Sequence, residues 1–165
     1  MRANRRMRAY LDDLRSREVS AESLLPERMP GDLELVQAGE CVLLRRVAQK
    51  PPRPLADLAH WTNVECLVNK LSMNDMVNPR ISRGVPLVLL MGGLLLAERF
   101  ARQLAHFPGR YNVIVSYDGE ACAVRFHKIR AGERWLMEDL EDYPDEGVLV
   151  LDAGAQAAAQ TRLLS

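Results

Sequence analysis

A β-hairpin is encoded in residues 111–128, which have the sequence YNVIVSYDGEACAVRFHK. The dipeptide Asp118-Gly119 is a strong signal for a two-residue type I′ turn between antiparallel strands. In that register the facing pairs are Tyr117–Glu120, Val115–Cys122, Val113–Val124 and Tyr111–Phe126. These residues then share one face of the hairpin, and Asn112 faces Arg125 on the other. A slip of one residue would scatter the apolar set, so the pattern predicts strands over 111–117 and 120–128.

The segments that follow the hairpin predict a short helix and one more strand. Leu136, Leu140 and Tyr143 would lie on one side of a helix from Trp135 to Tyr143, which Pro144 would end. The run Val148 to Leu151 consists of four apolar residues. Such a run is typical of a strand buried on both faces, so we expect it inside the sheet.

Helices are predicted before the hairpin. Residues 85–107 form the clearest one, with Leu90, Leu94, Ala97, Ala101 and Leu104 on one face. Its first half is apolar all round and should be covered on several sides, and Pro108-Gly109 ends it. Residues 2–19 predict another helix, because apolar residues recur there at spacings of three and four.

Residues 63–73 predict a further helix, which starts with the sequence of a capping box. In such a box the Thr62 hydroxyl accepts from the third helical amide, and Glu65 bonds back to the Thr62 amide. Residues 33–47 suit either a helix or a strand pair around Gly39, and we favour strands.

Together these elements predict an α+β fold, with N-terminal helices packed on a small, mostly antiparallel sheet. The sheet is built around the 111–128 hairpin and the buried 148–151 strand. Residues 1–152 are expected to form one domain, with 51–152 as its core and 1–50 as an extension private to this chain. Residues 153–165 are expected to be a mobile tail.

Composition and charge restrict the classes of function. The chain has 165 residues, 22 Lys plus Arg and 22 Asp plus Glu, and a net charge near zero argues against direct nucleic-acid binding. Three cysteines lie far apart, without metal-ligand spacing, and favour a reducing compartment. No signal peptide is recognised, and the apolar run 85–97 is too short to cross a bilayer. We therefore expect a cytoplasmic protein that does not bind membranes.

The sequence lacks the motifs of common catalytic and cofactor sites. It contains no nucleophile elbow, phosphate loop, dinucleotide fingerprint or zinc-type histidine pair. We therefore expect no catalytic residues, no metal and no cofactor. The enzymatic alternative predicts a concave pocket that holds a titratable residue with a perturbed pKa.

The acidic stretch between the hairpin and the last strand is the main surface signal. Its members are Glu133, Glu138, Asp139, Glu141, Asp142, Asp145 and Glu146. One interpretation is a solvated helix face. The other is a negative patch that docks a basic partner and speeds association. Catalysis by these carboxylates would require one of them to be desolvated, with a raised pKa.

Four neighbouring residues complete the candidate partner-binding set. Trp135 and Tyr143 flank the acidic stretch and are either anchors for a partner or packing residues. His127 and Arg125 lie side by side on the polar face of the hairpin. His127 is either a contact to a partner or an ordinary strand histidine.

Two segments resemble a known class of protein. They are WTNVECLVNKL, residues 61–71, and RFHKIRAGERWL, residues 125–136, which continues through DLEDY at 139–143. They resemble the small immunity proteins of bacterial contact-dependent growth inhibition and related polymorphic toxin systems. The resemblance covers about residues 55–152 and does not extend to the first fifty.

The resemblance implies a protein that binds and neutralises the C-terminal domain of one cognate toxin, and many such toxins are nucleases. It assigns no contact residue. The alternative is a non-catalytic adaptor, chaperone or regulatory module, in which helix 85–107 would present an apolar surface to a partner or a second copy. Whether the chain forms a homo-oligomer stays open.

Overall fold

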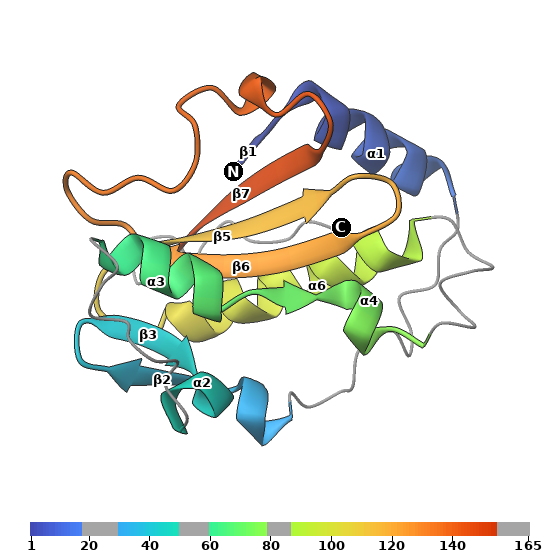
Figure 1. Ribbon diagram of the computed structural model, residues 1–165. Helices are drawn as coiled ribbons and strands as arrows, with labels where there is room; N and C mark the ends of the chain where they lie inside the picture. The colour runs from blue at the N-terminus through green and yellow to red at the C-terminus, as the bar shows by residue number, and fades with distance from the viewer. Residues whose placement is uncertain (18–29, 50–59, 79–86, 155–165) are drawn as a thin grey trace.

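The computed structural model describes residues 1–17, 30–49, 60–78 and 87–154. The strands are β1 (Arg2–Ala3), β2 (Leu35–Ala38), β3 (Cys41–Leu44), β4 (Leu71–Ser72), β5 (Arg110–Tyr117), β6 (Cys122–Lys128) and β7 (Gly147–Gly154). The helices are α1 (Arg5–Ser16), α2 (Arg45–Gln49), α3 (Trp61–Val68), α4 (Met73–Met76) and α6 (Val88–Leu104), with 3-10 turns η1 (Gly31–Leu33) and η3 (Leu140–Asp142). Figure 1 shows their arrangement.

A five-stranded antiparallel sheet organises the molecule, with the strand order β1-β7-β5-β6-β4. A separate hairpin of β2 and β3 lies below α3 (Figure 1). These observations confirm the α+β fold and the preference for strands in 33–47. They also confirm that the 148–151 strand is internal, because β7 lies between β1 and β5. Residues 153 and 154 continue β7, and the rest of the expected tail lies outside the described residues.

The hairpin register is two residues away from the prediction. Tyr117 pairs with Cys122, not with Glu120, and Asn112 pairs with His127, not with Arg125. The connection is therefore a four-residue loop. Asp118 explains it, because its carboxylate accepts from the amides of Glu120 (2.8 Å) and Ala121 (2.7 Å). A shift of two residues keeps every side chain on its predicted face.

Helices α6 and α1 cover one face of the sheet and form the main core with it. All five residues of the predicted face of α6 are buried, and its first turns, Val88 to Leu94, are buried all round. Gly93 allows the close contact with the sheet, since a Cβ there would lie 2.5 Å from Cys122 Sγ. Helix α1 adds Met7 and Leu14 to this core.

Helix α3 and the segment between β6 and β7 cover part of the other face. A second apolar cluster forms there, with Trp135, Leu136 and Tyr143 packed against it. Its buried members are Cys66, Ile114, Leu140, Val148 and Val150. Figure 1 shows this long segment crossing above the sheet before it enters β7.

The predicted capping box at α3 is wrong. The helix begins at Trp61, so Thr62 lies inside it, and the Thr62 amide donates to Glu133 (2.8 Å). Glu65 is fully buried and accepts from Val42 N (2.9 Å), Lys128 N (2.7 Å) and Arg130 (2.7 Å). Helix 63–73 is likewise shorter than predicted, because the chain leaves α3 at Asn69 and enters β4.

The first helix also starts later than predicted. Arg2 and Ala3 form β1, which pairs with Leu149 and Val150 of β7. Asn4 is the N-cap of α1, and its side chain accepts from Met7 N (2.9 Å). The predicted end at Val19 lies outside the described residues.

Candidate functional site

The candidate site is the connection between β6 and β7, residues 129–146, called the 129–146 segment below. The predicted helix over 135–143 is wrong, because only the 3-10 turn Leu140–Asp142 is regular. Asp139 caps this turn by accepting from Glu141 N at 2.9 Å. Most of the segment is therefore held by side chains and not by a helical ladder.

Asn4 is the main anchor of the 129–146 segment. Its amide nitrogen donates to three carbonyls, those of Leu140 (3.3 Å), Tyr143 (3.3 Å) and Glu146 (2.8 Å). Its Oδ1 accepts from Val148 N (3.0 Å) as well as from the first turn of α1. One side chain, 1% exposed, thus fixes the segment to β7 and α1.

Two of the acidic residues are used inside the molecule. Glu141 accepts from Arg5 N (2.9 Å) and pairs with Arg8 (3.0 Å), so it lies at the N-terminus of α1, where a carboxylate is stabilising. Glu133 holds the N-terminus of α3 through Thr62 N. Burial opposes ionisation of Glu133, but the hydrogen bonds from Thr62 and the charges of Arg130 and His60 together outweigh it and lower the pKa of this carboxyl.

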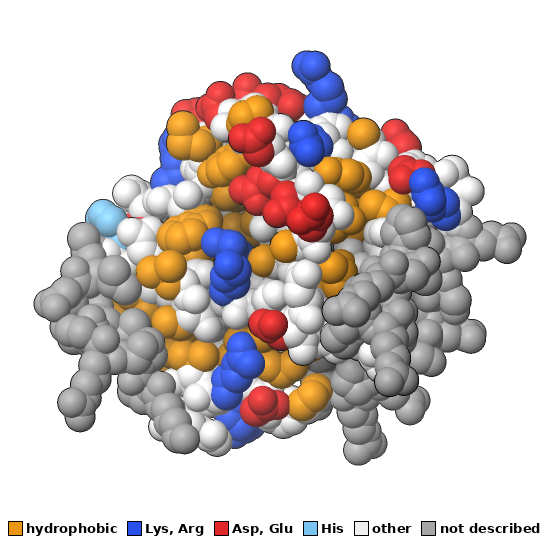
Figure 2. Space-filling model, turned by 45° about the vertical axis from the view of Figure 1, so that its right-hand side comes forward, with side chains coloured by type: hydrophobic (Ala, Val, Ile, Leu, Met, Phe, Trp, Pro, Cys, Tyr) orange, Lys and Arg blue, Asp and Glu red, His pale blue; other side chains and the backbone are white. Residues whose placement is uncertain are grey.

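Other acids of the segment face outward. Glu138 pairs with Arg134 at 3.1 Å, and its side chain is 87% exposed. Asp139, Asp142 and Asp145 are exposed. The carboxylates of Asp142 and Asp145 have no hydrogen-bond or ion-pair partner among the described residues. Figure 2 shows acidic side chains gathered at the top of the molecule, over the part of the segment that carries η3. Glu146 is half-buried.

The candidate anchors Trp135 and Tyr143 are half-buried and pack on the second apolar cluster. The guanidinium of Arg125 lies over the Trp135 ring, 5.7 Å from the ring centroid, in a cation–π contact. The Tyr143 hydroxyl accepts from Met137 N at 3.0 Å. These contacts hold the segment on the sheet, and Arg125, Trp135 and Tyr143 line one shallow hollow there.

His127 lies under the 129–146 segment and is only 4% exposed. Its Nδ1 is 2.9 Å from the Lys128 carbonyl oxygen, so Nδ1 carries the proton. Its Nε2 then accepts from the Asn112 amide at 3.4 Å. Burial lowers the pKa of His127, which favours the neutral imidazole.

His127 and Asn112 line a pocket of about 280 Å³, called the His127 pocket below. The enzymatic alternative predicts such a pocket, with a titratable residue of perturbed pKa. The described lining contains no Ser, Thr, Cys or Lys side chain, however, and the Glu133 and Glu138 carboxylates in the wall already have partners. A free base next to a nucleophile is therefore missing from the described lining.

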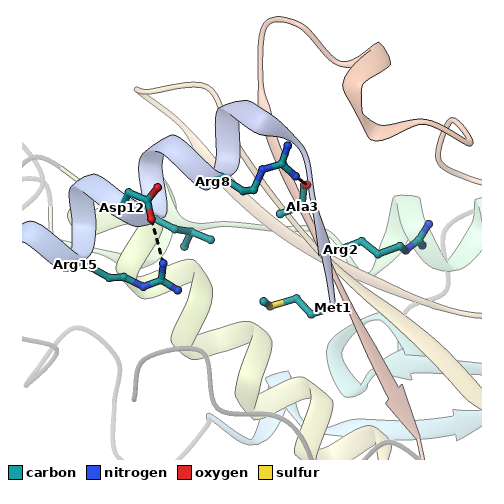
Figure 3. A pocket seen from close by; sticks show the side chains of 7 residues that line it. Met1, Arg2, Ala3, Arg8, Asp12 and Arg15 are labelled. Carbon is teal, nitrogen blue, oxygen red and sulfur yellow. Dashed lines mark hydrogen bonds and ion pairs between the residues drawn. The ribbon is translucent and has the colours of Figure 1, made fainter.

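A second hollow, of about 560 Å³, lies between β1 and α1 (Figure 3). Ala3 and Leu11 contribute apolar lining, and Arg2, Arg8 and Arg15 surround it. Figure 3 shows Arg2 pointing away from α1 and Arg15 turned to Asp12, with which it pairs at 3.1 Å. These cations do not converge on one point, so the hollow lacks the geometry of an anion site.

The described side chains offer little else for covalent or metal chemistry. All three cysteines are buried, and burial raises the pKa of Cys41 to about 11 and that of Cys66 and Cys122 to about 12. These thiols are protonated and unreactive. In the described ranges, no three His, Cys, Asp or Glu side chains gather closely enough to hold a metal ion. The helices of the same ranges include none with the length and apolarity needed for a membrane span.

Comparisons with known proteins place the chain in a family. A family model described as the uncharacterized protein PM0498 family matches residues 2–161. The chain belongs to this family. No curated protein and no solved structure matches it. The PM0498 match includes most of the first fifty residues, which the resemblance to immunity proteins does not cover, and β1 and α1 within them are part of the sheet and core.

Three residues central to the site were missed by sequence reasoning. Asn4 had a usable signal, since an Asn directly before an amphipathic run is a common N-cap. Glu65 was assigned to the wrong bonds, because its partners lie 23 and 63 residues away in sequence. Asn112 had no signal, because only the observed strand register places it opposite His127.

Proposed function

We propose that this chain is an immunity protein, which binds and neutralises the basic C-terminal domain of a cognate bacterial toxin in the cytoplasm. The observation that carries the proposal is the fixed shape of the 129–146 segment. Irregular segments on a rigid scaffold are common binding surfaces, and a segment already ordered before association loses less entropy on binding. The sequence resemblance supplies the toxin as the partner.

Charge on the segment supports a basic partner. The exposed acids are Glu138, Asp139, Asp142 and Asp145. The carboxylates of Asp142 and Asp145 have no partner among the described residues. Such charges steer a basic protein to the surface and raise its association rate. Arg5, Arg6 and Arg8 of α1 lie beside the segment, so the negative surface is narrower than the acidic run in the sequence.

The adaptor alternative gains less support. It requires helix 85–107 to present an apolar surface, but the apolar residues of α6 are buried against the sheet and α4, apart from the half-buried Leu95. A concentration-dependent dimer in light scattering would favour it over the immunity proposal.

The test begins with capture of a partner from host lysate at low and then moderate salt. A captured protein is expressed alone and then with this chain, in cells whose growth is measured. We expect the partner to be basic and toxic, and co-expression of this chain to restore growth. A captured protein that is not toxic, or whose toxicity this chain does not relieve, would contradict the proposal.

Charge reversal then maps the surface. Asp142→Lys with Asp145→Lys should weaken partner binding at least tenfold while the fold is kept, because both side chains are exposed and carry no described structural bond. Asp75→Lys with Glu120→Lys is the matched control, since it changes the net charge equally at exposed sites on α4 and the hairpin loop. Glu141 is unsuitable because it holds α1. Equal effects of the two double variants would show that only net charge matters.

A further inference from the structure

The His127 pocket lies between the end of the sheet and the first part of the 129–146 segment. Its floor includes Asn112 of β5 and His127 of β6, and Ile129, Leu136 and Met137 form apolar walls. Its volume, about 280 Å³, is just below the range of roughly 300–1,000 Å³ of small-molecule sites. It therefore suits one long side chain better than a cofactor.

The floor of the His127 pocket is rich in hydrogen-bond acceptors. Asn112 Oδ1 is buried and accepts no hydrogen bond from any described residue. Such an unpaired acceptor costs free energy, which a ligand that supplies a donor would recover. The Nε2 of neutral His127 is a second acceptor, whose only contact is the long one of 3.4 Å to Asn112. Because Oδ1 has no exposed surface in the structure, a ligand that donates to it requires a rotation of the Asn112 carboxamide, which only the weak 3.4 Å contact opposes among the described side chains.

The walls and rim indicate what kind of donor fits. Ile129 and Met137 are 37% and 55% exposed, which leaves apolar surface for an aliphatic stem. The Glu133 and Glu138 carboxylates lie on the rim. The positive charge of Arg134 is offset by its ion pair with Glu138. Arg2 is the remaining cation of the lining, and its side chain is exposed.

We propose that the His127 pocket receives a single arginine or lysine side chain of a protein partner. The cationic head lies at the carboxamide of Asn112 and His127 Nε2, and the methylene stem packs between Ile129 and Met137. This inference rests on the proposed function for the identity of the partner, but the pocket can be tested without one.

The probe is Nα-acetyl-arginine amide, titrated at millimolar concentration into the full chain labelled with ¹⁵N and ¹³C. We expect saturable NMR shifts of the Asn112 side-chain amide and the His127 imidazole. Nα-acetyl-leucine amide and Nα-acetyl-glutamate amide, the apolar and anionic controls, should not produce them. Equal shifts with the glutamate compound, or none with the arginine compound, would overturn the proposal.

Three variants sharpen the test. Asn112→Leu removes the acceptor and should weaken binding of the arginine probe about fivefold, the value of one hydrogen bond. Asn112→Asp, which replaces the amide with a second acceptor and adds a negative charge, should tighten it. Arg2→Ala removes a positive charge, the same sign as that of the probe, from the pocket mouth. This change should also tighten binding of the arginine probe. Weaker binding of the arginine probe to Arg2→Ala would contradict the inference, because removing a positive charge should not weaken the attraction of a cation.

The two proposals fail in different ways. If the arginine probe does not bind but Asp142→Lys with Asp145→Lys abolishes growth rescue, the pocket inference is wrong and the immunity function stands. If the probe binds but no toxic partner is captured, the pocket stands and the immunity function is wrong.

Discussion

At the scale of single residues, the side chains of Glu65 and Asn69 form hydrogen bonds with strand backbone that a neighbouring strand would otherwise form. Glu65 lies on α3 and Asn69 is the C-cap of this helix, one turn further on, so the two side chains point in the same direction. Glu65 accepts from Val42 N on β3 and Lys128 N on β6. Asn69 accepts from Leu44 N (3.1 Å) and donates to the Val42 carbonyl (2.9 Å). These two side chains therefore join the β2–β3 hairpin to the main sheet.

Glu65→Gln tests this role. The substitution removes the charge opposite Arg130 and places an amide donor where the carboxylate accepts from N–H groups. Breaking a buried ion pair costs about 3–5 kcal/mol, so we expect the free energy of unfolding to fall by about 3 kcal/mol. Urea unfolding followed by circular dichroism measures it. Glu138→Gln, at an exposed ion pair, should leave the midpoint unchanged. If the unfolding midpoint of Glu65→Gln were as close to that of wild type as the midpoint of Glu138→Gln, Glu65 would not join the β2–β3 hairpin to the sheet.

At the scale of elements, the contact of α6 with the hairpin depends on one missing side chain. Gly93 faces Cys122, Val115 and Val124, at 2.5, 3.5 and 3.6 Å from a Cβ built at that position. Its neighbour Gly92 faces only the flexible end of Met73 (2.9 Å) and Val77 (3.5 Å). The two glycines thus look equivalent in sequence but differ in what surrounds them.

Gly93→Ala should destabilise the protein by about 1–3 kcal/mol, the usual cost of overpacking a core. Gly92→Ala should cost less, because Met73 can move and alanine favours the helix. Adding Cys122→Ala to Gly93→Ala should recover part of the loss, since the nearest atom is gone. Thermal unfolding of wild type, Gly93→Ala, Cys122→Ala and the double variant gives the coupling energy between the two positions. A coupling of zero would contradict direct contact between residues 93 and 122.

The elements also show what the sequence could and could not predict. Periodicity gave the buried face of α6 and the faces of β5 and β6, because burial follows a repeat that is local in the chain. The register was missed by two residues because it depends on the hydrogen bonds of Asp118 and not on hydrophobicity. The helix predicted over 135–143 failed for a similar reason. Its carbonyls bond to Asn4, more than 130 residues away.

The candidate site was predicted in part for the same physical reason. The acidic residues of the 129–146 segment are visible in the sequence, but their separate roles are not. Glu141 and Glu133 are structural because helix N-termini lie beside them, and those termini come from distant parts of the chain. Asp142 and Asp145 stay exposed, and no helix N-terminus in the described ranges binds their carboxylates.

At the scale of the whole molecule, side chains bind some of the backbone groups at both edges of the sheet. Asn74 extends the short β4 by donating to the Glu120 carbonyl and accepting from Cys122 N. At the opposite edge, Asn4 accepts from Val148 N, and the guanidinium of Arg8 bonds to the Ala3 carbonyl. Such coverage keeps edge strands from pairing with other molecules.

Asn4→Ala should release the 129–146 segment. The variant loses a helix cap, worth about 1–2 kcal/mol, and leaves Val148 N without its acceptor. Hydrogen exchange should therefore become faster at Val148 and across residues 140–146. Asn74→Ala is the matched control, since it removes an Asn with similar backbone bonds at the other edge and should affect the hairpin loop alone. Unchanged exchange in the segment of Asn4→Ala would show that its apolar contacts suffice to hold it.

The pairing of β1 with β7 has a consequence for the order of events during synthesis. Arg2 is translated 148 residues before its partner Val150. Until then β1 has no strand to join, and Asn4 has none of the carbonyls that it binds in the finished protein. The acidic surface therefore gains these contacts only once β7 has been made. A chain that lacks β7 therefore lacks the strand and the Val148 amide to which β1 and Asn4 bind in the finished protein.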